Sequence, residues 1–390
     1  MRRAFGRRTF LWAAAGALAV AGLTQAGPAA AQDAKDPEVY RIGAILAMSG
    51  KADWYGKVMS QAIQQAVDEI NAKGGIDGVK LEAIIEDHKS GVAKEGVAAM
   101  NRLINLNDVQ AVLTSFSPPT LAISPIADEK GILLLNGGGV STALIGASKY
   151  LFHNRSLASD LGQAAAQRAQ ELGLKKMAQL AWKTDAGESV IATVDPFWKK
   201  AGGEVVATEF MEVGAPNIDT QVAKIRASGP DWVGLWLFSP DPGLALKKIR
   251  EFGMDVPVIG IEYNADIQKV GGKYTDGYEY TSDYFAPTEA WAEQFAKDYE
   301  ARHGEAPEFY AANYYEGVYV IAEAIRRAKA KGGDYWDGAK LAEAIRENPS
   351  FDSVYGGQMV YQDNGVAKKK VALFEVKDGQ SSFVKYIALD

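Results

Sequence analysis

Short apolar runs alternate with segments of helical periodicity along the chain, and this alternation constrains the fold more than any other feature. Residues 40–48 form the first apolar run, and apolar residues then recur at helical spacing from Met59 to Ile70. The pattern continues with strands predicted at 79–86, 109–115 and 132–136 and helices predicted at 92–106 and 118–130. Strand, helix and strand in this order are the repeating unit of a parallel sheet.

The same alternation begins a second time at residue 161. Helices are predicted at 161–173, 190–201, 221–228 and 244–252, and strands at 177–181, 204–210, 232–237 and 258–261. Two arrays of similar size predict an α/β protein with two doubly wound parallel-sheet lobes. Because no Ser/Gly-rich linker separates the arrays, we expect a hinge of several short crossovers.

The remaining residues must return to one or both lobes, so each domain is expected to be discontinuous. Helices are predicted here at 291–303, 314–331 and 340–348, followed by strands at 358–361, 371–376 and 383–389.

The first 31 residues have the layout of a cleaved export signal. Arginines are followed by an apolar run from Phe10 to Leu23 and by small residues up to Ala31. The run RRTFL at residues 7–11 resembles a twin-arginine signal, which predicts that route of export. The alternative, a membrane anchor, is disfavoured because the apolar run from Phe10 to Leu23 is shorter than the roughly 20 residues that a membrane span needs.

Charge and cysteine content narrow the class of partner. Removal of the signal with its four arginines would leave 359 residues and change the net charge from −7 to −11. An acidic chain is a poor partner for nucleic acid or anionic lipid. There is no cysteine, which excludes disulfides, thiolate metal sites and a lipidated N-terminal cysteine. We therefore expect a periplasmic protein that is not lipid-anchored.

Glycines and hydroxyls follow the predicted strands of the first array, where ligands of open parallel sheets bind. Glycine permits a close approach to the backbone, so we predict that the N–H groups here face a carboxylate, with help from a serine hydroxyl. The alternative is a tight turn without a ligand. The residues concerned are Ser117, Gly137, Gly138, Gly139 and Ser141.

Acids and aromatic residues follow the predicted strands of the second array. Asp185 and Glu262 are placed where a carboxylate could meet an ammonium group, although each also suits a surface or a helix cap. The gathering of aromatic residues at strand ends favours a pocket for a flat or apolar group over a purely structural role. These residues are Trp54, Tyr55, Phe116, Trp236, Phe238, Tyr263, Phe309 and Tyr310.

No set of catalytic or metal-binding residues is apparent. His88, His153 and His303 are scattered, and the sequence has neither an H-E-x-x-H nor a G-x-S-x-G motif. We therefore predict no enzymatic activity, no metal and no cofactor.

Residues 41–90 resemble the start of the branched-chain amino acid (leucine/isoleucine/valine) group of periplasmic solute-binding proteins. The specific parts are MSG at 48–50, the pair Tyr55-Gly56, INAKGGIDG at 70–78 and ADEKGILLLN ending at Asn136. The resemblance implies the substrate-binding component of an ABC importer: two lobes, joined by three crossovers, that close around one solute and deliver it to a membrane permease. It implies lobes of 38–158 with 285–362 and of 159–284 with 363–390, and a monomer suits this role.

The resemblance also implies roles for individual residues. The carboxylate of the solute would be held by Ser117, the three glycines and Ser141, and Tyr55 or Trp54 would cover its side chain. Glu262 would take the ammonium group. Residues near Phe238 and Phe309 would complete the wall.

Three departures from the family pattern leave the solute open. Gly139-Val140 stands where amino-acid binders usually have Ala-Thr, Pro118-Pro119 replaces small hydroxyl residues, and Ala186-Gly187 replaces an aromatic-Gly pair. The solute expected is a branched-chain or other hydrophobic amino acid. The alternative is an aromatic or aliphatic carboxylic acid or an amide. A secreted enzyme and a receptor-type sensor are less favoured rivals.

Overall fold

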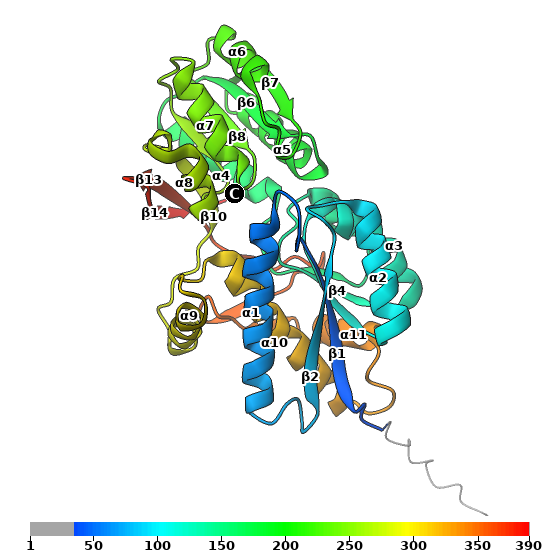
Figure 1. Cartoon of the computed structure of the whole chain (residues 1–390). Helices are drawn as coiled ribbons and strands as arrows, with labels where there is room; N and C mark the ends of the chain where they lie inside the picture. The colour runs from blue at the N-terminus through cyan, green and yellow to red at the C-terminus, as the bar shows by residue number, and fades with distance from the viewer. Residues whose placement is uncertain (1–34, 390) are drawn as a thin grey trace, which may run out of the picture.

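The computed structural model describes residues 35–389 and has two α/β lobes, one above the other in Figure 1. The predicted export signal and its cleavage site lie outside these residues. Among the helices between residues 35 and 389, none is long and apolar enough to cross a bilayer.

The first lobe is built on a five-stranded parallel sheet with the order β2-β1-β3-β4-β5. Its strands are β1 (Val39–Leu46), β2 (Lys80–Asp87), β3 (Ala111–Thr114), β4 (Leu133–Asn136) and β5 (Leu151–His153). Its helices are α1 (Asp53–Ala72), α2 (Ala93–Asn107), α3 (Ser117–Lys130), α9 (Ala290–His303), α10 (Phe309–Ala330) and α11 (Gly338–Glu347). Figure 1 shows α1 and α10 on one side of the sheet and α2 and α3 on the other.

Alternate residues of the central strands face the two helical layers. Leu113 and Leu135 belong to the core that includes α1 and α10, whereas Val112 and Leu134 belong to the core under α2 and α3. Every residue of β3 and β4 is buried, as expected for a parallel sheet that is covered on both faces.

The second lobe has a seven-stranded sheet with the order β14-β13-β10-β9-β8-β6-β7. Its strands are β6 (Lys176–Trp182), β7 (Glu204–Met211), β8 (Trp232–Trp236), β9 (Val258–Gly260), β10 (Glu279–Asp283), β13 (Val371–Lys377) and β14 (Gln380–Ile387). Its helices are α4 (Ala158–Glu171), α5 (Asp185–Lys200), α6 (Asp219–Ala227), α7 (Asp241–Glu251) and α8 (Ala265–Gly271).

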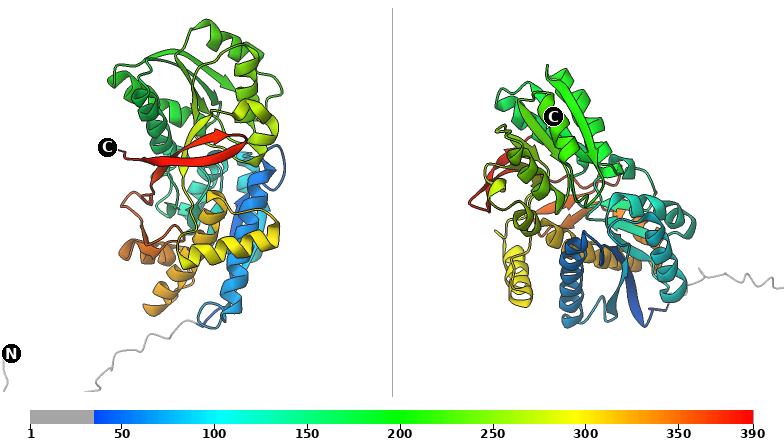
Figure 2. Two further views of the ribbon diagram at one scale, coloured as in Figure 1. Left: turned by 90° about the vertical axis from the view of Figure 1, so that its left-hand side faces the viewer. Right: turned by 45° about the horizontal axis from the view of Figure 1, so that its top comes forward.

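The predicted parallel sheet is present in this lobe, and an antiparallel hairpin extends it at one edge. β13 pairs antiparallel with β10, and β14 pairs antiparallel with β13. The reason is the direction of entry, because β13 arrives from the first lobe rather than through a βα crossover. It then returns through the tight turn at Asp378-Gly379, where both residues have positive φ. The left view of Figure 2 shows this hairpin lying at the junction of the lobes.

Three crossovers join the lobes, at residues 154–157, 284–289 and 361–370. The first is tied to the end of β10, directly before the second, because the Ser156 N–H donates to both carboxylate oxygens of Asp283 at 3.3 and 3.2 Å. The third remains beside the first lobe at Val366, which bridges to His153. The predicted strand at 358–361 is β12 (Gln358–Val360), which pairs with β11 (Ser350–Asp352) in a separate small sheet.

Gly56 fixes the approach of α1 to the end of β1. A Cβ atom at this position would lie 2.1 Å from the carbonyl oxygen of Ala47, which is backbone and has no rotamer to change. The glycine therefore lets the first turn of α1 sit directly against the strand end.

We expect Gly56→Ala to lower the free energy of unfolding by about 1–3 kcal/mol, the usual cost of overpacking. Helix propensity alone predicts the opposite sign, a gain of roughly 0.5–1 kcal/mol. Urea unfolding distinguishes the two, with Gln64→Ala on the exposed face of the same helix as the control. A stabilised Gly56→Ala variant would refute the packing argument.

Candidate functional site

A cavity of about 80 Å³ lies between the lobes, at the carboxyl ends of the parallel strands of both sheets. Such strand ends are the usual ligand-binding edge of open α/β sheets. The first lobe contributes Tyr55, Met59, Ser90, Gly91, Phe116, Ser117, Pro118, Gly138, Gly139, Val140 and Tyr310 to the lining. The second lobe contributes Trp182, Thr184, Ala186, Val213 and Phe238.

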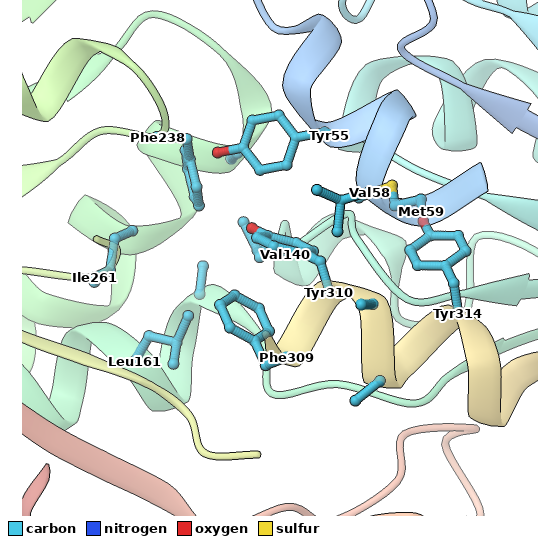
Figure 3. Close-up of a cluster of buried hydrophobic side chains, with 14 of the residues drawn as sticks. Tyr55, Val58, Met59, Val140, Leu161, Phe238, Ile261, Phe309, Tyr310 and Tyr314 are labelled. Carbon is cyan, nitrogen blue, oxygen red and sulfur yellow. The ribbon is translucent and has the colours of Figure 1, made fainter. Parts of the chain in front are cut away.

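Five aromatic residues, Tyr55, Phe116, Trp182, Phe238 and Tyr310, contribute to the cavity wall. The ring of Tyr55 packs edge-on against Phe116 at 5.4 Å and against Tyr310 at 5.0 Å between centroids. From the other lobe, Trp182 and Phe238 lie 5.2 Å apart. Figure 3 shows Tyr55, Phe238 and Tyr310 converging from α1, the β8 end and α10. A wall of this kind suits a solute with an apolar or aromatic body.

A buried acid fixes the orientation of Trp182. Its indole N–H donates to Asp241 Oδ2 at 2.7 Å, and the same oxygen accepts the Gly214 N–H at 2.7 Å. Asp241 is the first residue of α7 and is 3 % exposed. The ring of Trp182 is thus held rigidly at the cavity.

The glycine loop differs from its predicted role. The amides of Gly138 and Gly139 donate to Asn136 Oδ1 at 3.2 and 2.6 Å, so their hydrogens are already engaged. None of the three glycines has positive φ. They are required instead for packing, because a Cβ at Gly138 would lie 2.9 Å from the hydroxyl of Tyr314.

Hydroxyl groups supply the polar part of the lining. The Oγ of Ser117 accepts the N–H groups of Val140 and Ser141 at 3.2 and 3.0 Å, which leaves its own hydrogen free to donate. Ser117 begins α3, whose positive dipole end favours a carboxylate. Because Pro118 and Pro119 have no N–H, the hydroxyls of Ser117 and Thr184 become more important for an anion.

A buried hydrogen-bonded bridge joins the lobes beside the cavity. The Tyr55 hydroxyl donates to Glu262 Oε1 at 2.6 Å and accepts the Ser239 N–H at 2.8 Å. The Tyr310 hydroxyl donates to Glu262 Oε2 at 3.4 Å. Tyr55 and Tyr310 belong to the first lobe, whereas Ser239 and Glu262 belong to the second.

Burial governs the charge of Glu262, which is 1 % exposed. Its burial raises the pKa of the carboxyl group to about 8, and the hydrogen bond from Tyr55 and the charge of Arg155 only partly oppose this. At neutral pH the group is therefore largely uncharged in this arrangement. A solute ammonium group would meet a neutral carboxyl already occupied by two tyrosines.

Arg155 is a buried charge that sequence reasoning missed. It lies in the first crossover and is 1 % exposed. Its Nη1 donates to the Gly138 carbonyl at 2.7 Å and to the Tyr310 hydroxyl at 3.4 Å, and its Nε donates to the Ser156 carbonyl at 2.9 Å. Its guanidinium group also lies 5.3 Å from the ring centroid of Tyr310. No periodicity marks this residue, because its partners come from a distant loop and helix.

The structure brings seven of the predicted site residues to the cavity wall. Those that line it are Tyr55, Phe116, Ser117, Gly138, Gly139, Phe238 and Tyr310. Glu262 lies directly behind two of them, and the half-buried Trp54 packs edge-on against Tyr55. The Ser141 hydroxyl is 2.7 Å from that of Ser189, so it links the lobes.

Three predicted residues lie elsewhere. Asp185 is exposed at the start of α5, where Thr184 rather than Asp185 faces the cavity. Tyr263 and Phe309 line a second pocket between the lobes. Trp182, Val213 and Met59 line the cavity but were not among the predicted residues. The available signal was the position of Trp182, which directly follows the predicted strand at 177–181.

We expect Glu262→Gln to change how stability depends on pH. The folded-state pKa is raised above the ordinary 4.5, so wild-type stability falls as the pH rises from that value to about 8. The neutral amide removes this loss, and the variant should gain relative to wild type between pH 5 and pH 9 in urea unfolding. Exposed Glu300→Gln is the control. Parallel pH profiles for Glu262→Gln and wild type would contradict the burial argument.

We expect Arg155→Met to destabilise the fold by about 1–3 kcal/mol for each buried acceptor that it leaves unpaired. Arg155→Lys should recover part of the loss, because an ammonium can reach one acceptor but lacks the guanidinium fork. Chemical denaturation measures both, with the exposed Arg41→Met as a control expected to stay within about 0.5 kcal/mol. Equal effects at Arg155 and Arg41 would show that the buried contacts contribute nothing.

Comparison with known proteins agrees with this geometry. The family model described as "Periplasmic binding protein" matches residues 39–381. The leucine-, isoleucine-, valine-, threonine- and alanine-binding protein of Pseudomonas aeruginosa is 24% identical over 87% of this chain and 88% of its own length. The Leu/Ile/Val/Thr-binding protein of Salmonella typhimurium is 28% identical over 61% of this chain and 66% of its own.

Solved structures share the fold. A leucine-binding protein from Thermotoga maritima superimposes with a TM-score of 0.82 at 24% identity, covering 90% of this chain and 99% of that one. A solute-binding protein of an ABC transporter from R. palustris, in complex with benzoate, gives 0.79 at 20% identity, covering 89% and 96%. With the family match spanning both lobes, the chain belongs to the periplasmic binding protein family.

Proposed function

We propose that this protein is the substrate-binding component of an ABC importer and captures a small carboxylate-bearing solute between its lobes. The observation that carries the proposal is the cavity between the lobes, which is lined by side chains of both. A solute that touches both lobes favours the closed arrangement by its differential affinity. A membrane permease would then receive the solute from the closed form.

The geometry favours an aromatic or aliphatic carboxylic acid without an ammonium group. The lining residues include no Asp, Glu, Lys or Arg, and most are apolar or aromatic. Glu262 is engaged by Tyr55 and Tyr310 rather than free to take an ammonium group. The carboxylate of the solute would meet the Ser117 hydroxyl at the start of α3.

A branched-chain or other hydrophobic amino acid is the second candidate, favoured by the relatives that bind such solutes. For this solute, the ammonium group would replace the Tyr55 hydroxyl on an ionised Glu262. An attractive ion pair of this kind would repay the cost of ionising the buried carboxyl.

The proposal also covers the export route, the oligomeric state and the boundaries of the moving lobes. We infer that the protein is exported to the periplasm by the twin-arginine route, without a lipid anchor, and acts there as a monomer with no catalytic activity. We infer that the moving bodies are residues 38–158 with 285–362 and residues 159–284 with 363–390. The division of strands between the two sheets supports this assignment.

A thermal-shift screen of the twenty amino acids and a panel of aromatic, keto and aliphatic acids and amides tests the solute class. We expect benzoate-like or short aliphatic acids to raise the melting temperature by mass action. Glu262→Gln should change their dissociation constants less than threefold, whereas an amino acid would lose about 2–5 kcal/mol of affinity with this variant.

Phe238→Ala is the matched control in the cavity wall and should weaken either solute class. Shifts with leucine or valine alone, abolished by Glu262→Gln, would reject the acid in favour of the amino acid. The absence of any saturable shift would reject solute capture.

A further inference from the structure

A second pocket, of about 630 Å³, lies between the lobes and is separated from the cavity by the start of α10. The consecutive residues Phe309 and Tyr310 divide the two spaces: Tyr310 lines the cavity, and Phe309 lines the second pocket. We call this second pocket the aromatic pocket. It shares no lining residue with the cavity, so it is a distinct place for a ligand.

Aromatic rings from the second lobe form one wall of the aromatic pocket. Tyr280 stacks on Phe374 with centroids 4.9 Å apart and an interplanar angle of 11°. Tyr263 lies 5.8 Å from Tyr280. The hydroxyls of Tyr263 and Tyr280 are held by the Gly379 carbonyl and Ser381, respectively, which fixes the orientation of the rings.

The opposite wall comes from the first lobe and carries a carboxylate. Glu308 caps α10 through Oε1, which accepts the Ala311 N–H at 3.1 Å. Within residues 35–389, no hydrogen bond to its second oxygen, Oε2, is formed. Burial raises the pKa of this carboxyl group to about 7, and the backbone N–H groups of Tyr310 and Ala311 and the charge of Arg155 only partly oppose this.

The charges around the aromatic pocket are unbalanced. Its lining includes Glu308 and Asp283 but no Lys or Arg. The nearby Arg155 directs its hydrogen bonds away, to Gly138, Ser156 and Tyr310. Ser282 also lines the pocket, and its buried hydroxyl has no hydrogen-bond partner among the described residues.

We propose that the aromatic pocket is a second binding site, which takes a small organic cation with an aromatic or alkyl body. The ring of Tyr263 attracts a cation through its quadrupole, as the ring of Phe309 already does for the Arg155 guanidinium at 5.6 Å, and the carboxylate of Glu308 supplies the countercharge. A primary amine could in addition donate to the Ser282 hydroxyl.

The location of the site implies coupling to solute capture. Glu308 and Phe309 belong to the first lobe and Tyr263 and Tyr280 to the second, so a bound cation holds the lobes together. If two ligands both bind the closed form more tightly than the open form, each raises the affinity of the protein for the other. The two factors are equal, because the coupling is reciprocal. The coupling rests on the proposed capture between lobes, whereas binding of the cation does not.

The test is calorimetric titration of the protein with benzyltrimethylammonium, with benzyl alcohol as the neutral comparator. We expect saturable one-to-one binding of the cation and at least about tenfold weaker binding of the alcohol. Glu308→Gln keeps the helix cap but removes the charge, and this variant should bind the cation about tenfold more weakly. Tyr263→Leu should bind the cation several-fold more weakly, because the substitution removes one ring.

Two controls locate the binding. The exposed Glu300→Gln should leave the cation affinity unchanged, and Phe238→Ala in the cavity should change it less than twofold. Melting temperatures of all variants verify folding. No saturable binding by wild type, or equal binding by wild type, Glu308→Gln and Tyr263→Leu, would overturn the site.

The coupling is measured by titrating leucine and benzoate with and without saturating benzyltrimethylammonium. We expect the affinity of whichever solute binds to rise several-fold, and that of the cation to rise by the same factor when the solute is present. Unchanged affinities would overturn the coupling. Cation binding without any binding of leucine or benzoate would uphold the site and count against the proposed solutes.

Discussion

The hydroxyl of Tyr55 makes the contact on which the arrangement of the lobes depends. It donates to Glu262 and accepts from the Ser239 amide, so one atom of the first lobe satisfies two polar groups of the second. Hydrogen bonds of this kind are strong where water is excluded, and each partner left without the other would be costly. Direct lobe-to-lobe hydrogen bonds therefore stabilise this arrangement of the lobes.

This bridge also explains the character of the cavity. The tyrosine that spans the lobes brings its ring against Phe116 and Tyr310, so the wall becomes aromatic where the bridge forms. The acid that would otherwise attract an ammonium group is enclosed behind two phenols. Burial makes its charged form unfavourable, and the cavity lining itself offers shape, ring contacts and hydroxyl groups rather than a charged side chain.

The loop after β4 shows the same preference for internal bonds. Asn136 takes the amides of Gly138 and Gly139, and Arg155 takes the carbonyl of Gly138. A loop that satisfies its own backbone in this way is rigid and presents little unpaired backbone to a ligand. Gly137 and Gly138 serve the close packing of Tyr314, and Gly139 that of Leu144 and Phe116, rather than a left-handed backbone conformation.

How much of this could be predicted from the sequence differed from residue to residue. Tyr55, Phe116 and Phe238, which follow the ends of β1, β3 and β8, line the cavity because parallel strands carry their following residues to one edge. Asp185 does not line it, because one position along a strand-to-helix turn decides whether a side chain faces the cleft or the solvent. Phe309 and Tyr310 are adjacent on a helix and therefore face different pockets.

The sequence by itself determined the two α/β arrays, the family and the edge of each sheet at which the cavity lies, because hydrophobic periodicity and strand ends are local properties of the chain. The tertiary structure alone decided the protonation of Glu262, the antiparallel β13–β14 hairpin and the role of Arg155. Each of these depends on groups from distant segments that meet only when the lobes are assembled, and the free energy of a buried charge or hydrogen bond is set by those neighbours.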